Sequence, residues 1–131
     1  MESKSMKPAD CVPRDKHDLP AVRRARALGF PGLNAVLPEL LQWICDANWP
    51  VAPEVADLLS QSGQEIIPHL QRVLHSKDSD WKFWTIDLVI RNLDPDIRQQ
   101  LRADLELLAN RASREDKLNE VDVVSNEVLN L

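Results

Sequence analysis

The side chains in this sequence best suited to metal chemistry are three histidines and two cysteines: His17, His69, His75, Cys11 and Cys45. His69 and His75 lie six positions apart, which separates them by about 240° around a helix, so one helix face cannot present both rings to a metal. No His-Glu-x-x-His motif occurs, and the cysteines lack the Cys-x-x-Cys spacing of zinc sites. We therefore expect no metal site and no cofactor, and we interpret both cysteines as free thiols in a reducing compartment.

Serines and paired acids are the remaining groups that could act in catalysis. A nucleophilic serine needs a base within hydrogen-bond reach and a third group that orients this base. The serines instead cluster near expected helix ends, where serine commonly caps the backbone: Ser60, Ser62, Ser76 and Ser79. Asp78 and Asp80 lie in an expected turn and helix start, where the helix dipole favours negative charge. The three scattered glycines form no phosphate-binding loop, so the sequence predicts a protein with no catalytic residue that is not an enzyme.

The four tryptophans flank two expected turns. Trp43 and Trp49 lie on either side of the first turn, and Trp81 and Trp84 lie at the second. We expect them to fill the ends of helical hairpins, because aromatic side chains contribute much of a small core. Alternatively, one or two of them stay partly exposed and anchor a partner, since tryptophan is enriched at the hot spots of interfaces.

A helical hairpin that occurs twice within residues 34–93 organises these side chains. The first copy covers residues 35–61 and the second covers residues 65–91. Pro38 and Pro68 occupy matching positions 30 residues apart. A repeat of this length is typical of stacked helix pairs, which cannot bury their apolar faces singly.

Apolar residues recur at intervals of three and four positions through both copies, as in the buried face of a helix. They comprise Leu37, Leu40, Leu41 and Ile44 in the first copy, and Ile66, Ile67, Leu70, Val73 and Leu74 in the second. The same spacing after residue 93 predicts a third, diverged hairpin, with the stripe Ile97, Leu101, Leu105 and Leu108 and the stripe Leu118, Val121, Val124 and Val128.

Caps and stops set the limits of the expected helices. Asp18, Asn34 and Ser113 stand where N-caps are expected, and Gly29 and Gly63 stand where glycine ends a helix. The sequence thus predicts an all-α protein of about seven helices, with no sheet.

Length and composition fit a single domain. The chain has 131 residues, of which 44% are apolar, enough for one hydrophobic core. Residues 1–15 are polar and lack helical periodicity, so we expect a flexible N-terminal arm followed by one domain over residues 16–131. No apolar run is long enough to span a membrane or to form a secretory signal, so we expect a cytoplasmic protein that does not bind membranes.

Charge is distributed unevenly along the chain. Residues 1–30 hold seven Lys/Arg against four Asp/Glu, whereas residues 31–131 hold nine against seventeen. An acidic folded body repels phosphate backbones, so we expect no binding of nucleic acid. A basic protein partner would be attracted instead.

Several segments together resemble HEAT repeats and, over a longer string, an uncharacterised bacterial family of unknown function built on such hairpins. The segments are Val12-Pro13-Arg14-Asp15-Lys16-His17-Asp18, Leu28-Gly29-Phe30-Pro31, Leu37-Pro38-Glu39-Leu40-Leu41-Gln42-Trp43, Asn48-Trp49-Pro50-Val51-Ala52, Glu65-Ile66-Ile67-Pro68-His69 and Trp81-Lys82-Phe83-Trp84. The resemblance implies a short right-handed α-α superhelix of HEAT-like helix pairs. HEAT repeats carry an arginine early in the second helix that forms an Asp–Arg ladder, but Ala52-Pro53 and Phe83-Trp84 occupy that region here.

A helical repeat scaffold with an acidic body and no assembled catalytic group favours a non-enzymatic protein-binding module, such as a toxin-immunity protein or a small adaptor. We expect it to bind another protein, with a basic one favoured by the acidic body, on a concave face formed by the second helices: Glu54, Asp57, Gln61, Trp81, Lys82 and Asp87. The alternatives are a nucleic-acid-processing enzyme on a HEAT-like scaffold, or a nucleic-acid-binding protein that uses Arg23, Arg24 and Arg26.

Overall fold

The chain folds into helices joined by short turns. The computed structural model describes residues 6–131 and contains no strand in this range, which confirms the all-α prediction. Its α-helices are α1 (Leu19–Leu28), α2 (Leu37–Leu41), α3 (Val51–Leu59), α4 (Ile67–Leu74), α5 (Ser79–Trp84), α6 (Pro95–Arg98), α7 (Arg102–Asn110), α8 (Arg114–Leu118) and α9 (Val121–Leu129). Short 3₁₀ segments extend several of them: η2 (Gly32–Val36), η3 (Gln42–Ile44), η4 (Gly63–Ile66), η6 (Ile90–Asn92) and η7 (Gln99–Leu101).

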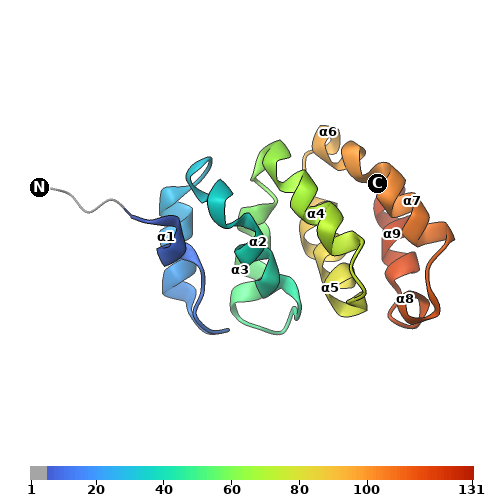
Figure 1. Ribbon diagram of the computed structural model, residues 1–131, viewed down its shortest axis with the longest axis horizontal. Helices are drawn as coiled ribbons and strands as arrows, with labels where there is room; N and C mark the ends of the chain where they lie inside the picture. The colour runs from blue at the N-terminus through green and yellow to red at the C-terminus, as the bar shows by residue number, and fades with distance from the viewer. Residues whose placement is uncertain (1–5) are drawn as a thin grey trace, which may run out of the picture.

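The helices stand side by side in a row of hairpins (Figure 1). Helix α1 begins the row, and the hairpins α2–α3, α4–α5 and α7–α9 follow in chain order. Each hairpin packs its two helices together, and α3 also contacts α1 before it and the continuation of α5 after it. The two predicted copies of the hairpin are therefore adjacent units of one stack.

The predicted apolar stripes form the core between the two helices of each hairpin. Leu37, Leu40 and Ile44 are fully buried, as are Ile66 and Leu70 in the second copy. Proline stands in the first turn of both α2 and α4, where the backbone N–H groups have no intrahelical acceptor. The repeated proline therefore marks the same structural position in both copies.

Most of the expected caps and stops are present. Asp18 accepts a hydrogen bond from the Ala21 amide, and Gly29 ends α1 with φ of 65°, a region that favours glycine. Gly63 also has a positive φ, of 79°, but α3 ends earlier, at Leu59, and Gly63 begins η4. Asn34 does not cap a helix. The chain already turns into η2 at Gly32, so Asn34 lies inside this 3₁₀ segment and its backbone carbonyl, rather than its side chain, bonds Leu37.

Part of the segment that we expect to be a flexible N-terminal arm, residues 1–15, packs against the domain. Residues 1–5 lie outside the described range, but the chain forms a 3₁₀ turn at Pro8–Cys11 that packs on α1 and η2. Cys11 is fully buried, and Arg24 Nε donates a hydrogen bond to the Asp10 carbonyl at 2.7 Å. This segment therefore belongs to the folded domain, and the missing helical periodicity reflects a short turn rather than a flexible chain.

The last expected helix, which carries the stripe from Leu118 to Val128, is split in two. Glu120 adopts a left-handed backbone with φ of 61° and separates α8 from α9. The break rotates α8 relative to the stripe of α9, so Leu118 is 74% exposed whereas Val121, Val124 and Val128 are buried. Leu118 was expected in the core because a continuous helix would have placed it there.

The second helix of the α4–α5 hairpin is irregular. After α5 the chain forms a π-helical turn at Thr85–Val89, named η5, and then the 3₁₀ segment η6. Ile86, Val89 and Ile90 remain buried along it. No helix within residues 6–131 combines the length and apolar content needed to span a membrane.

Candidate functional site

The six residues predicted to bind a partner differ in their exposure. Glu54, Asp57 and Gln61 are exposed on α3 or just after it, as expected. Trp81 and Asp87 are half-buried, and Lys82 is only 5% exposed. The structure thus leaves the three residues at α3 accessible and removes Lys82 from the predicted binding face.

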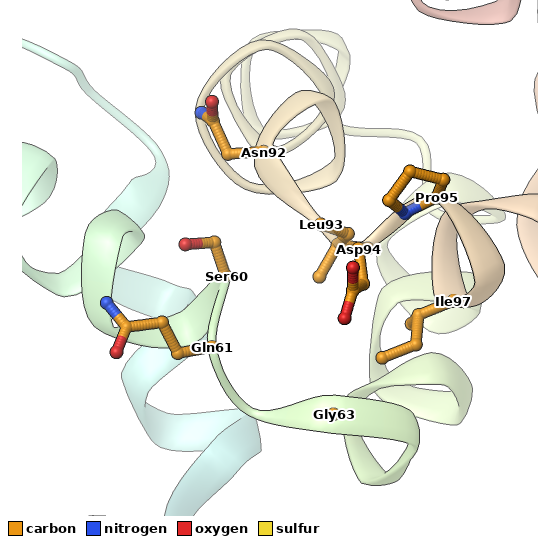
Figure 2. Close-up of a pocket in the computed structure, with 8 residues that line it drawn as sticks. All are labelled: Ser60, Gln61, Gly63, Asn92, Leu93, Asp94, Pro95 and Ile97. Atoms are coloured by element: carbon orange, nitrogen blue, oxygen red, sulfur yellow. The ribbon is translucent and has the colours of Figure 1, made fainter.

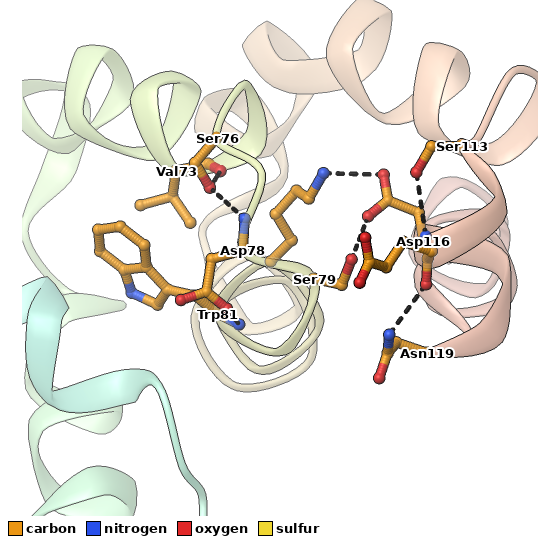
Figure 3. A network of polar contacts seen from close by, with 10 residues as sticks. Val73, Ser76, Asp78, Ser79, Trp81, Ser113, Asp116 and Asn119 are labelled. Carbon is orange, nitrogen blue, oxygen red and sulfur yellow. Dashed lines mark hydrogen bonds and ion pairs between the residues drawn. The ribbon is translucent and has the colours of Figure 1, made fainter.

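Lys82 forms a buried ion pair instead of a surface contact. Its Nζ lies 2.8 Å from Asp116 Oδ2, and the Ser79 hydroxyl donates a 2.6 Å hydrogen bond to Asp116 Oδ1 (Figure 3). The Asp116 amide in turn donates to the Ser113 hydroxyl, the expected cap of α8. The pair joins the α4–α5 hairpin to the last hairpin, so Lys82 is not available to a partner.

The sequence holds a signal for this burial. Ser79, Lys82 and Ile86 are spaced by three and four positions, so Lys82 lies on the inward stripe of its own helix. The α8 cap was predicted, but Asp116 does not turn back to the Ser113 amide as in a capping box. Its carboxylate points across to Lys82 instead.

Partner groups around Asp116 lower the pKa of its carboxyl. Burial alone would raise this pKa, but the hydrogen bonds from Lys82 and Ser79 favour the charged form more strongly, so the pKa lies below its usual value. The ionised carboxylate is therefore the form that stabilises the fold.

Asp116 should make stability depend on pH. Because its folded-state pKa is below that of the unfolded chain, its contribution is present above about pH 4 and is lost as pH falls through the folded pKa. In urea unfolding from pH 7 to pH 2, the difference in free energy of unfolding between wild type and Asp116→Asn should shrink below about pH 4. A difference that stays constant over this range would show that the carboxylate charge has no stabilising role.

Arginine–carboxylate pairs connect neighbouring helices along the stack. Arg26 on α1 lies 3.0 Å from Glu54 and 3.1 Å from Asp57 on α3. Arg91 on η6 lies 2.8 Å from both Asp87 and Glu127, which links η5 and η6 to α9. Arg26 and Arg91 therefore each link neighbouring helices of the stack.

The tryptophans pack against the ends of the hairpins. Trp81 Nε1 donates a 2.8 Å hydrogen bond to the Leu41 carbonyl, which ties α5 to α2. Trp43 meets Trp49 edge-to-face with ring centroids 5.6 Å apart. Trp43, Trp81 and Trp84 contact the main core. These contacts agree with the expectation that the tryptophans fill the ends of the hairpins.

The thiol of Cys45 is protonated near neutral pH. Burial, and secondarily the carboxylates of Asp78, Asp46 and Asp80, raise its pKa to about 11. A thiolate is the reactive form of cysteine, so this environment does not favour nucleophilic chemistry. Within residues 6–131 no group of three or more His, Cys, Asp or Glu side chains is arranged to hold a metal ion.

Three adjacent pockets follow α3 from its start to its end, and we call them the α3 groove. The first two lie between α1 and α3 and share Arg26, and the second and third share Gln61. The lining residues are Leu19, Val22, Arg23, Arg26, Pro50 and Glu54, then Arg26, Gly29, Phe30, Leu58 and Gln61, then Ser60, Gln61, Gly63, Asn92, Leu93, Asp94, Pro95 and Ile97.

The third pocket of the α3 groove has a volume of about 450 Å³ and a polar rim. Figure 2 shows it between the end of α3 and the start of α6, with the Asp94 carboxylate directed into the space. Ser60 and Gln61 border it on the side of α3. Among residues 6–131, no Lys, Arg or His side chain forms an ion pair with Asp94.

The fold and the pockets define an all-α protein built as a stack of helical hairpins, with three neighbouring pockets along α3. Residues 11–129 match the family described as a domain of unknown function (DUF5071), and the chain belongs to this family. A comparison with curated proteins gave no match.

Proposed function

We propose that the protein is a non-enzymatic binding module that holds a segment of another protein in the α3 groove. The observation that carries this proposal is that three neighbouring pockets lie along and just beyond α3, with Arg26 shared by the first two and Gln61 shared by the last two. The groove combines apolar side chains with the carboxylates of Glu54 and Asp94, the amides of Gln61 and Asn92, and the guanidinium groups of Arg23 and Arg26. It also contains Glu54 and Gln61 from the predicted partner-binding set, and Asp57 lies beside it.

The partner segment is basic in this proposal. Arg26 already pairs with Glu54 and Asp57, but the three side chains are 38%, 52% and 60% exposed. Exposed ion pairs contribute only about 0.2–1 kcal/mol, so a lysine or arginine of the partner can replace Arg26 at little cost. Asp94, at the far end of the groove, provides a further carboxylate.

The proposal also covers the cellular compartment and the biological role of the protein. The hairpins act as HEAT-like repeats of a bacterial, cytoplasmic protein, and the module is a toxin-immunity protein or a small adaptor. Cys11 and Cys45 are both free, which fits a reducing compartment. A small module that blocks or recruits one partner needs a binding surface and no catalytic group.

Gln61 is the position at which the proposed function is tested. It lines two of the three pockets, so Gln61→Arg should fill their junction and repel a basic partner. In pull-downs from the lysate of the source cell, we expect the variant to lose at least about 90% of the captured partner, equivalent to about 1.4 kcal/mol of binding free energy.

Gln100→Arg is the matched control, because it makes the same change at an exposed residue outside the groove. It should capture the partner as wild type does. Equal capture by wild type and Gln61→Arg would show that the α3 groove is not the interface. Salt-sensitive binding to DNA or tRNA would instead favour the nucleic-acid alternative.

A further inference from the structure

A separate pocket of about 220 Å³ opens between α2 and α4, away from the α3 groove, and we call it the α2–α4 pocket. Pro38, Leu41 and Val73 form its apolar walls together with Trp81. The hydrogen bond from Trp81 Nε1 to the Leu41 carbonyl holds the indole in place. The pocket is therefore apolar and supported by the core. It is smaller than the roughly 300–1,000 Å³ of most small-molecule sites, which suits a single side chain.

The polar part of the α2–α4 pocket contains one permanent cation. This is Arg72, an exposed residue, which lines the pocket together with the Gln42 amide. Among residues 6–131 no carboxylate lies within 4.0 Å of this guanidinium, whereas Arg26 and Arg91 each contact two carboxylates. His69 also lines the pocket, and its Nδ1 is shielded from solvent and has no hydrogen-bond partner in the described residues. Buried polar atoms in this state are uncommon in folded proteins.

We propose that the α2–α4 pocket binds the C-terminal residue of a partner polypeptide, with an apolar side chain in the pocket and the terminal carboxylate on Arg72. The planar guanidinium matches a carboxylate and can bind it with two parallel hydrogen bonds. A C-terminal residue carries the carboxylate and the side chain on one Cα atom. Its side chain can therefore fill the small apolar pocket while its carboxylate pairs with Arg72. An internal apolar residue would fill the pocket without using the Arg72 guanidinium.

Three acetylated tripeptides test this assignment by NMR titration of the full chain. The probes are Ala-Ala-Phe with a free carboxylate, the same peptide as the C-terminal amide, and Ala-Ala-Gly with a free carboxylate. The Trp81 indole N–H signal, assigned with Trp81→Phe, reports on the pocket wall. We expect a saturable shift with the first peptide and binding at least about tenfold weaker for the other two, because the amide cannot form the charge-assisted bond to Arg72 and glycine leaves the apolar pocket unfilled.

Arg72→Gln and Arg111→Gln form the matched pair of variants, since Arg111 is exposed, lies outside the pocket and forms no ion pair within residues 6–131. Arg72→Gln should bind the acid and the amide equally weakly, whereas Arg111→Gln should keep the preference for the acid. Gln61→Arg in the α3 groove should also keep it, which separates the two sites. The proposal is overturned by no saturable shift, by equal binding of the amide or the glycine peptide to wild type, or by the same loss in both arginine variants.

Discussion

Replacing Lys82 with methionine is expected to lower the free energy of unfolding by about 3–5 kcal/mol, because it leaves a buried carboxylate without its counter-charge. Lys82 and Asp116 are 5% and 4% exposed, and their charged atoms lie 2.8 Å apart. Methionine keeps much of the volume of the lysine stem, so the change isolates the loss of the ammonium group. Urea unfolding followed by circular dichroism at pH 7 measures the effect.

The double variant Lys82→Met with Asp116→Asn is the control for this prediction. It removes both charges and keeps an acceptor for the Ser79 hydroxyl, which otherwise bonds Asp116 Oδ1 at 2.6 Å. Since replacing both members of a buried pair is far less damaging than removing one, the double variant should recover more than half of the lost stability. If it is no more stable than Lys82→Met alone, the loss comes from packing and not from the unpaired charge.

The fold could be predicted largely from local features. The proline of each first helix, the cap at Asp18 and the stop at Gly29 act within a few residues of themselves, and all appear as expected. The position of Leu118 could not be predicted in this way. It depends on the left-handed backbone of Glu120, a conformation that sequence spacing does not reveal because glutamate rarely adopts it.

The candidate site was less predictable because its residues are brought together across the chain. Lys82 lies on an inward stripe, but its partner Asp116 is 34 positions away. Arg26 reaches Glu54 and Asp57 over 28 and 31 positions. Both acids were expected to be exposed, and they are, but their internal cation could not be inferred from helical spacing. The α3 groove likewise depends on how α1 and α6 lie beside α3, which is a property of packing between hairpins.

Trp81→Ala is expected to destabilise the fold by about 3 kcal/mol, near the lower end of the range for buried aromatic side chains. Trp81 is half-buried against the core, and its indole N–H satisfies the Leu41 carbonyl at 2.8 Å. The substitution removes both the ring and this link between α5 and α2. The midpoint of urea unfolding at pH 7 should therefore fall well below that of wild type.

Two further variants separate the contributions of Trp81. Trp81→Phe keeps an aromatic ring and removes the hydrogen bond, so it should lose only about 1 kcal/mol. Trp49→Ala removes a tryptophan that packs edge-to-face on Trp43, and it should lose about 1 kcal/mol because an aromatic pair is worth roughly 0.5–1.5 kcal/mol beyond its buried area. Equal losses for Trp81→Ala and Trp49→Ala would contradict a structural role for Trp81 in joining the hairpins. Any loss of partner binding in Trp81→Ala then has to be measured under conditions in which the variant is still folded, since unfolding alone would remove the α3 groove.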